Sequence, residues 1–138
     1  MKNQNVLNKI RQHVITNYKK INPEDMVLGE AFYNQRCHLN SVQKVKEGKA
    51  TKVFLCFAID RKDNSQCVHF INQTEDGKYV DNTWGWLCEQ SDYYLIREID
   101  ESEYDNIWDI LQNTKKSLFN TYATWFDKYI LRIKYNII

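Results

Sequence analysis

The chain has 138 residues, of which 43% are hydrophobic and 27% are charged, and these fractions are typical of a globular domain. Its aromatic content of 14% is enough to bury a core, which excludes disorder over most of the chain, and the net charge of +1 gives no electrostatic reason to bind nucleic acid or a membrane surface. The longest apolar run, residues 53–59, is far too short to cross a bilayer, and residues 1–5 lack the apolar stretch of a signal peptide. We therefore expect one domain, residues 1–138, located in the cytoplasm.

The first third of the chain predicts helices. Apolar residues recur at helical spacing over residues 4–20, and the only proline follows soon after. Residues 26–33 are compatible with a second, short helix. A third helix is predicted over residues 36–47, with Asn34 as its N-cap and Gly48 just after its last turn.

The middle of the chain predicts strands. Residues 51–59 are apolar on both faces, which indicates a central strand that is covered on both sides. Residues 67–71 and 78–84 are expected to pair as a hairpin, and residues 92–99 form a further strand candidate.

Helical spacing returns over residues 103–126, and Ser102 with Asp105 resembles a capping box at its start. The alternation of apolar and polar residues over 131–137 favours a final strand. The predicted fold class is therefore α+β: an antiparallel sheet, the helix of residues 36–47 packed on it, and additional N- and C-terminal helices.

Three residues in this framework suggest thiol chemistry. Cys37 lies in the first turn of a predicted helix, where the helix N-terminus favours a thiolate. His69 lies on the next-but-one predicted element, a strand, and Asp81 lies on the strand that pairs with it. A histidine can take the proton of a thiol, and a carboxylate can orient that histidine.

The order Cys, His, Asp and the local sequences resemble papain-like and transglutaminase-like cysteine enzymes. The stretches that carry the resemblance are RCHLN at 36–40, VHFI at 68–71 and YVDNTW at 79–84, within a matched region of about residues 33–86. The resemblance implies a core in which the nucleophile opens a helix packed on a sheet. It also implies acyl transfer through a thioester, on a substrate with an amide or ester bond, including a protein, with no cofactor.

The resemblance also points to the residues that would stabilise an oxyanion. Many papain-like peptidases have a glutamine several residues before the nucleophile, and here Gln35 lies two residues before it. Gln35, Asn34 or backbone N–H groups alone are the open alternatives for this role. His38 follows the nucleophile directly and points about 100° away from it on a helix, so it is a poor base for the thiol.

Residues around Asp81 complete the predicted site. Asn82 stands where related enzymes commonly have proline, and it is a second candidate to orient the histidine. Trp84 and Trp86 could wall a substrate cleft or be core aromatics, and for Trp84 the core interpretation is favoured.

The hairpin loop decides whether His69 and Asp81 can meet. A two-residue turn at 76–77 would put them on opposite faces, whereas a three-residue loop, 75–77, with its glycine in the left-handed region makes them diagonal neighbours about 7–8 Å apart. We predict the three-residue loop, because it also gives a coherent apolar face. The residues that it places on that face are Val68, Phe70, Val80 and Trp84.

Two other classes of function remain as alternatives. Cysteines and histidines supply zinc-type ligands, but the chain has no Cys-x-x-Cys or His-x-x-x-His spacing, so we predict no metal site. The four cysteines are expected to be reduced. The main alternative is a catalytically inactive papain-like fold that acts as a phage or bacterial protein-binding module, with an apolar patch from the Tyr- and Trp-rich C-terminal helix.

Overall fold

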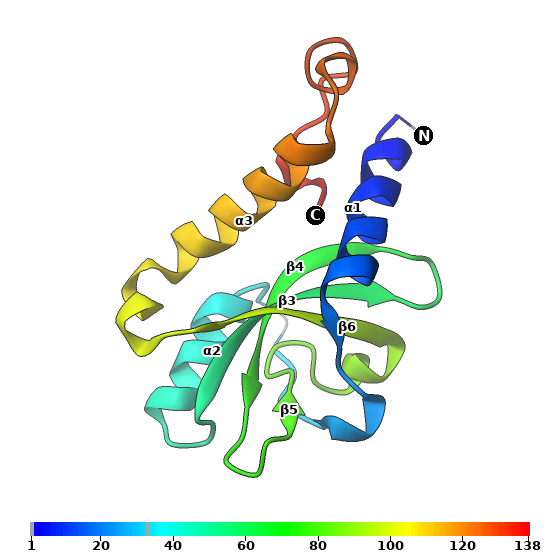
Figure 1. Cartoon of the computed structure of the whole chain (residues 1–138). Helices are drawn as coiled ribbons and strands as arrows, with labels where there is room; N and C mark the ends of the chain where they lie inside the picture. The colour runs from blue at the N-terminus through cyan, green and yellow to red at the C-terminus, as the bar shows by residue number, and fades with distance from the viewer. Residues whose placement is uncertain (1, 33) are drawn as a thin grey trace.

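The computed structural model describes residues 2–32 and 34–138, which form an α+β arrangement with a curled six-stranded sheet (Figure 1). The strands are β1 (Lys19–Lys20), β2 (Met26–Val27), β3 (Lys52–Asp60), β4 (Gln66–Gln73), β5 (Tyr79–Val80) and β6 (Ser91–Ile99). The α-helices are α1 (Gln4–Asn17), α2 (Cys37–Lys46) and α3 (Ile107–Tyr122). Shorter helical segments are η1 (Pro23–Asp25), η2 (Gly85–Gln90), η3 (Glu101–Asn106), the π-helical turn η4 (Phe126–Ile130) and η5 (Tyr135–Ile137).

The strand order is β1-β6-β3-β4-β5-β2, with β3 in the centre as its apolar sequence predicted. β3 pairs antiparallel with both β4 and β6. The prediction of a purely antiparallel sheet is wrong at one edge, because β2 runs parallel to β5. This edge strand is only two residues long, too short for an alternating pattern to reveal it.

The two faces of the sheet are covered differently. On one face, residues such as Leu55 and Phe70 form a cluster with apolar side chains of all three α-helices, and Figure 1 shows α1 and α3 on this side. On the other face, Cys56, Ile71 and Tyr93 pack against residues of η2 and of the segment that contains β2. None of the helices in the described residues is long and apolar enough to span a membrane.

The C-terminal third differs from its prediction in detail. The predicted helix of residues 103–126 is η3 followed by α3, and the capping box is formed by Asp100 and Glu103 rather than by Ser102. The strand predicted over 131–137 is wrong. Ile133 and Ile138 pack into the helical-side core from irregular backbone and from the end of η5, so burial and not strand pairing explains the apolar positions.

The short helix expected over residues 26–33 is also wrong. Met26 and Val27 form β2, residues 28–32 contain no helix, and residue 33 lies outside the described residues.

The hairpin has the predicted three-residue loop. The amide of Thr74 donates to the carbonyl of Lys78 at 2.9 Å, and Gly77 has a φ of 83° in the left-handed region. Asn72 pairs with Val80, which is the register that the three-residue loop requires. β5 ends at Val80, however, so the strand is shorter than the predicted 78–84.

Candidate active site

Cys37 is the first residue of α2 and its side chain is buried, with 8% exposed. The N-cap is Arg36, and no side chain caps this end of the helix. Asn34, which we expected to be the N-cap, lies two residues too early: its Oδ1 accepts from the Arg36 amide at 3.1 Å and from Asn40 Nδ2 at 3.1 Å. Asn34 therefore fixes the turn that leads into the helix, and it is not among the residues that line the cavity described below.

His69 and Asp81 are in direct contact. His69 Nε2 and Asp81 Oδ2 are 2.9 Å apart, and both side chains are buried. With Nε2 bound to the carboxylate, Nδ1 is the ring nitrogen left for the thiol, and Cys37 and His69 line one cavity. The structure thus brings together the three residues that the sequence singled out.

The Asp81 carboxylate is held by four hydrogen bonds. Oδ2 accepts from His69 and from the Tyr93 hydroxyl, the latter at 2.5 Å. Oδ1 accepts from the backbone amides of Thr83 and Trp84, both at 2.9 Å. Every acceptor position is used, so the carboxylate is fixed in the orientation that serves His69.

The electrostatics favour a thiolate–imidazolium pair. Burial alone would raise the pKa of Cys37, but His69, hydrogen bonds from His38 and His69 and the Phe70 amide outweigh burial and lower it to about 6. Burial opposes the charged form of His69, but Asp81 and Cys37 raise its pKa well above the usual value. Burial likewise opposes the Asp81 carboxylate, yet His69 and the hydrogen bonds keep the pKa of Asp81 below its usual range.

The other three cysteines have the opposite tendency. Burial raises the pKa of Cys56 well above its ordinary value, that of Cys67 to about 11, and that of Cys88 by a smaller amount. Of the four free thiols, Cys37 alone is poised to ionise near neutral pH.

A cavity of about 420 Å³ gives access to the thiol. Its lining residues are Gln35, Cys37, Cys67, Val68, His69, Thr83, Trp84, Trp108, Leu111 and Lys115. A second cavity of about 310 Å³ shares two of them, Cys67 and Trp84. Gln35 has a φ of 54°, and this left-handed backbone is rare for a residue other than glycine.

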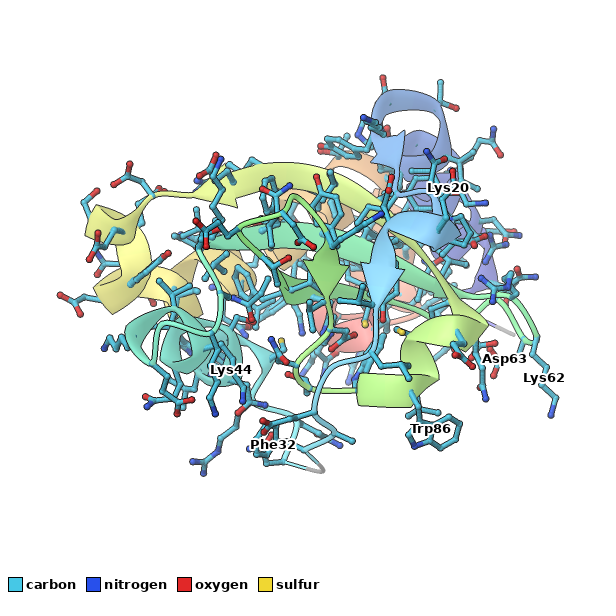
Figure 2. All side chains as sticks on the ribbon, turned by 90° about the horizontal axis from the view of Figure 1, so that it is seen from below. Lys20, Phe32, Lys44, Lys62, Asp63 and Trp86 are labelled. Atoms are coloured by element: carbon cyan, nitrogen blue, oxygen red, sulfur yellow. The ribbon has the colours of Figure 1, made fainter. Side chains whose placement is uncertain are left out.

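Trp84 lies flat on the His69 ring, with centroids 4.0 Å apart and planes 16° from parallel. This contradicts the expectation that Trp84 shares the face of Val68. The chain turns away after Val80, and the indole is carried to the histidine side of the sheet. Trp86 projects outward from η2 and is 54% exposed (Figure 2), so it does not wall this cavity.

Asn82 does not line the cavity. Its Nδ2 donates to Asn72 Oδ1 at 2.9 Å, and Asn72 in turn donates to the carbonyls of Ser41 and Lys52. Asn82 Oδ1 also accepts weakly from the Glu30 amide at 3.4 Å. We correct the prediction accordingly: Asn82 joins the hairpin to α2 and to the loop before it, and it leaves His69 to Asp81.

The segment before Gln35 contacts both α2 and the chain that follows β5. Lys44 of α2 is buried and pairs with Glu30 at 2.9 Å, and it lies over the Phe32 ring at 5.6 Å, an arrangement visible in Figure 2. The Phe32 amide donates to the Thr83 carbonyl at 2.7 Å. Gly29 passes so close to Asp81 that an added Cβ would lie 2.5 Å from the carbonyl oxygen of Asp81.

Sequence reasoning missed several residues of the site. Tyr93 comes from β6, and only strand pairing across β3 could have placed it near Asp81. Trp108 and Lys115 belong to the helix predicted over residues 103–126, for which no role in the site was predicted. His38, singled out only as a poor base for the thiol, is buried against Trp108 with ring centroids 4.9 Å apart. Its Nδ1 has no hydrogen-bond partner among the described residues.

Within residues 2–32 and 34–138, no group of three or more His, Cys, Asp or Glu side chains is arranged to hold a metal ion. Comparison of the chain with protein-family models, with curated proteins and with solved structures finds no significant match. A functional interpretation therefore depends on the geometry of the site.

Proposed function

We propose that this protein is a thiol-dependent acyl-transfer enzyme of papain-like or transglutaminase-like type. Cys37 is the nucleophile, His69 the base and then the acid, and Asp81 the orienting group. The single observation that carries the proposal is the 2.9 Å contact of His69 Nε2 with Asp81 Oδ2 in the cavity that Cys37 lines from the start of α2. The lowered pKa of Cys37, in a chain whose other three thiols have raised pKa values, agrees with it.

The supporting geometry is independent of any pKa. The thiol opens α2, the ring of His69 is held between Asp81 and Trp84, and all of these residues meet beside one cavity. Nε2 of the histidine is bound to the carboxylate, which leaves Nδ1 for the thiol, and this is the division of roles that a Cys-His-Asp triad needs.

The reaction would proceed in two steps. The Cys37 thiolate attacks the acyl carbon, a C–S bond forms, and the oxyanion is received by the Cys37 amide at the helix N-terminus and by Gln35. The His69 imidazolium gives its proton to the leaving amine or alcohol as the C–N or C–O bond breaks, which leaves a thioester. Water or an amine then attacks the thioester, with His69 taking the proton, and the thiolate is released.

The first test is the rate of iodoacetamide labelling at each cysteine against pH, read by mass spectrometry. With a pKa of about 6, Cys37 is about 90% thiolate at pH 7, whereas a thiol of pKa 9.0 is about 1% thiolate. Cys37 should therefore label fastest of the four, with a midpoint near pH 6. The variant His69→Ala should move that midpoint toward 9, and His13→Ala, a matched change on α1 away from the cavity, should not.

Acyl transfer itself can be tested with p-nitrophenyl acetate as a generic acyl donor. Attack by the thiolate releases nitrophenolate and leaves an acetyl thioester on Cys37, which is trapped in acid and located by mass spectrometry. An acetyl group on Cys37 in the wild type, and its loss in His69→Ala, supports the proposal. Slow labelling of Cys37 with an ordinary pH profile in both proteins would refute it.

A second candidate function is a protein-binding module that keeps this fold without catalysis. The observation in its favour is a cluster of exposed apolar side chains in and beside η4: Trp125, Phe126, Tyr129 and Ile130, each more than half exposed. Figure 1 shows this turn beyond the end of α3, away from the sheet. Such a patch is typical of an interaction surface. If Cys37 proves unreactive while Trp125→Ser with Tyr129→Ser abolishes self-association or partner binding, this function is favoured.

A further inference from the structure

Lys115 of α3 lines the same cavity as Cys37 and His69. Among the lining residues it is the only lysine, arginine, aspartate or glutamate. The side chain is partly buried, and it forms no ion pair within the described part of the chain. A cation that is partly withdrawn from water and has no counter-charge is a site for an anionic group.

The helix places this charge at a definite distance from the thiol. Trp108, Leu111 and Lys115 recur at helical spacing, so one face of α3 forms a wall of the cavity. Trp108 packs on His38, beside the nucleophile, and Lys115 lies seven residues further along, about 10 Å on the helix axis. Cys67 lines the same cavity and feels the charge of Lys115. It precedes His69 by two residues, which is about 7 Å along β4.

The rest of the cavity lining makes Lys115 selective for an anionic group. Trp84, Trp108 and Leu111 present apolar surface between the thiol and the lysine. An anion in such surroundings gains more from a cation than it would in water, and a cationic group in the same place would be repelled. Lys115 also helps to lower the pKa of the Cys67 thiol, against the larger effect of burial, so its charge is felt inside the cavity.

We propose that Lys115 determines specificity by binding a carboxylate of an acidic peptide substrate, two to three residues from the acyl carbon that Cys37 attacks. The spacing follows from the helix: Lys115 lies about 10 Å along α3 from Trp108, which packs beside the nucleophile, and an extended residue spans about 3.3 Å. This inference rests on the proposed acyl-transfer function, since it names the substrate class of the same site.

The test uses N-chloroacetyl tripeptide amides as probes. The thiolate displaces chloride from the chloroacetyl group, so a C–S bond forms and a C–Cl bond breaks. One residue of the probe is Glu, Gln or Lys, placed in turn at each of the three positions, and the others are Gly. The second-order rate of alkylation at Cys37 is measured for wild type, Lys115→Met, Lys115→Glu and Lys116→Glu. Lys116 is the matched control, because it lies over the Tyr135 ring and not in the cavity.

In the wild type, Glu at the second or third position should react about three- to tenfold faster than Gln, and Lys more slowly. Lys115→Met should abolish the preference for Glu, Lys115→Glu should invert it, and Lys116→Glu should retain it although it changes the net charge equally. A Glu-to-Gln ratio near one in the wild type, or a ratio that Lys116→Glu changes as much as Lys115→Glu, overturns the proposal. The rate of alkylation by the neutral Gln probe, compared between wild type and His69→Ala, tests the nucleophile separately. A failure of the acyl-transfer proposal can therefore be distinguished from a failure of the specificity proposal.

Discussion

Asp81→Asn is the substitution that tests the electrostatic reasoning most directly. Asparagine keeps the size of the side chain and can still accept from the backbone amides of Thr83 and Trp84 through Oδ1. It removes the negative charge that lies against His69 and places an amide N–H₂ where Oδ2 accepted from His69 and Tyr93. The substitution therefore changes the charge of the triad with little change in its shape.

The size of the expected effect follows from the contact between Asp81 and His69. Charges about 4 Å apart at an effective dielectric of about 20 attract by about 4 kcal/mol, and neighbours of this kind commonly shift a pKa by about 1–3 units. We expect the pKa of His69 to fall in Asp81→Asn, because the carboxylate is a main cause of its raised value. Neutral His69 no longer stabilises the thiolate, so the pH midpoint for labelling of Cys37 should rise from about 6 by about one unit or more.

The stability should change with pH in a defined direction. The pKa of His69 is raised in the folded state, so its contribution to stability is fully present below its ordinary value of 6.5 and is lost as pH rises through the folded value. The loss of unfolding free energy in Asp81→Asn should therefore be larger at about pH 5.5 than at about pH 10. Iodoacetamide kinetics and urea denaturation at both pH values measure the two effects.

The control is Asp105→Asn, which removes the same charge from an exposed position in η3. It should leave the labelling midpoint unchanged. If Asp81→Asn also leaves the midpoint near pH 6, the charge of His69 does not depend on this carboxylate, and the triad interpretation of the contact is refuted.

Three further substitutions test the surroundings of the site. Tyr93→Phe removes a donor to a buried carboxylate and should cost about 1.5–3 kcal/mol near pH 7 in urea denaturation. The cost should shrink as pH falls from 3.8 through the lowered pKa of Asp81, because the carboxylate is then protonated in the folded state; an equal cost at all pH values would contradict this. Gly29→Ala should cost about 1–3 kcal/mol and slow labelling of Cys37, because the added Cβ would meet the Asp81 carbonyl. The control is Gly48→Ala, where the φ of 75° strains an alanine but the space around the Cβ is empty, so the change should destabilise the protein without altering the labelling. His38→Phe should keep or slightly raise stability, because it removes a buried nitrogen without a partner, and should raise the midpoint for thiol labelling; an unchanged midpoint would show that His38 only packs.

The sequence could predict the contact between His69 and Asp81 because a short-range rule governs it. A three-residue loop with Gly77 in the left-handed region sets the register, and the register sets which side chains are neighbours. The helix that begins at Cys37 was predictable for a similar reason, since periodicity and the following Gly48 define it locally.

The misplaced residues depend on contacts that no local pattern encodes. Trp84 was assigned to the wrong face, because alternation continues through a sequence even where the strand has ended. Tyr93 reaches Asp81 from β6, three positions from β5 in the sheet, and Lys115 reaches the cavity only because α3 packs against β4. Each requires the three-dimensional arrangement of elements that are far apart in the chain.

The early end of β5 is what lets the thiol and the imidazole meet. Cys37 belongs to the core on the helical face of the sheet, whereas His69, two residues before Ile71, points to the other face. Of the described residues of β4, only Asn72 and Gln73 pair with β5, so the edge of β4 beside His69 is left open, and the thiol lies against the Phe70 amide there.

Asp81 is responsible for both halves of this arrangement. Its Oδ1 binds the amides of Thr83 and Trp84 and so turns the chain away from β4, which ends the strand. Its Oδ2 binds His69 across the edge that this turn exposes. Asp81→Ala would remove both functions and would not distinguish a lost triad from a longer β5, whereas Asp81→Asn retains the first and removes the second. A loss of thiol reactivity in the asparagine variant, with the hairpin unchanged by NMR, would therefore assign the effect to the charge of the carboxylate and not to the fold.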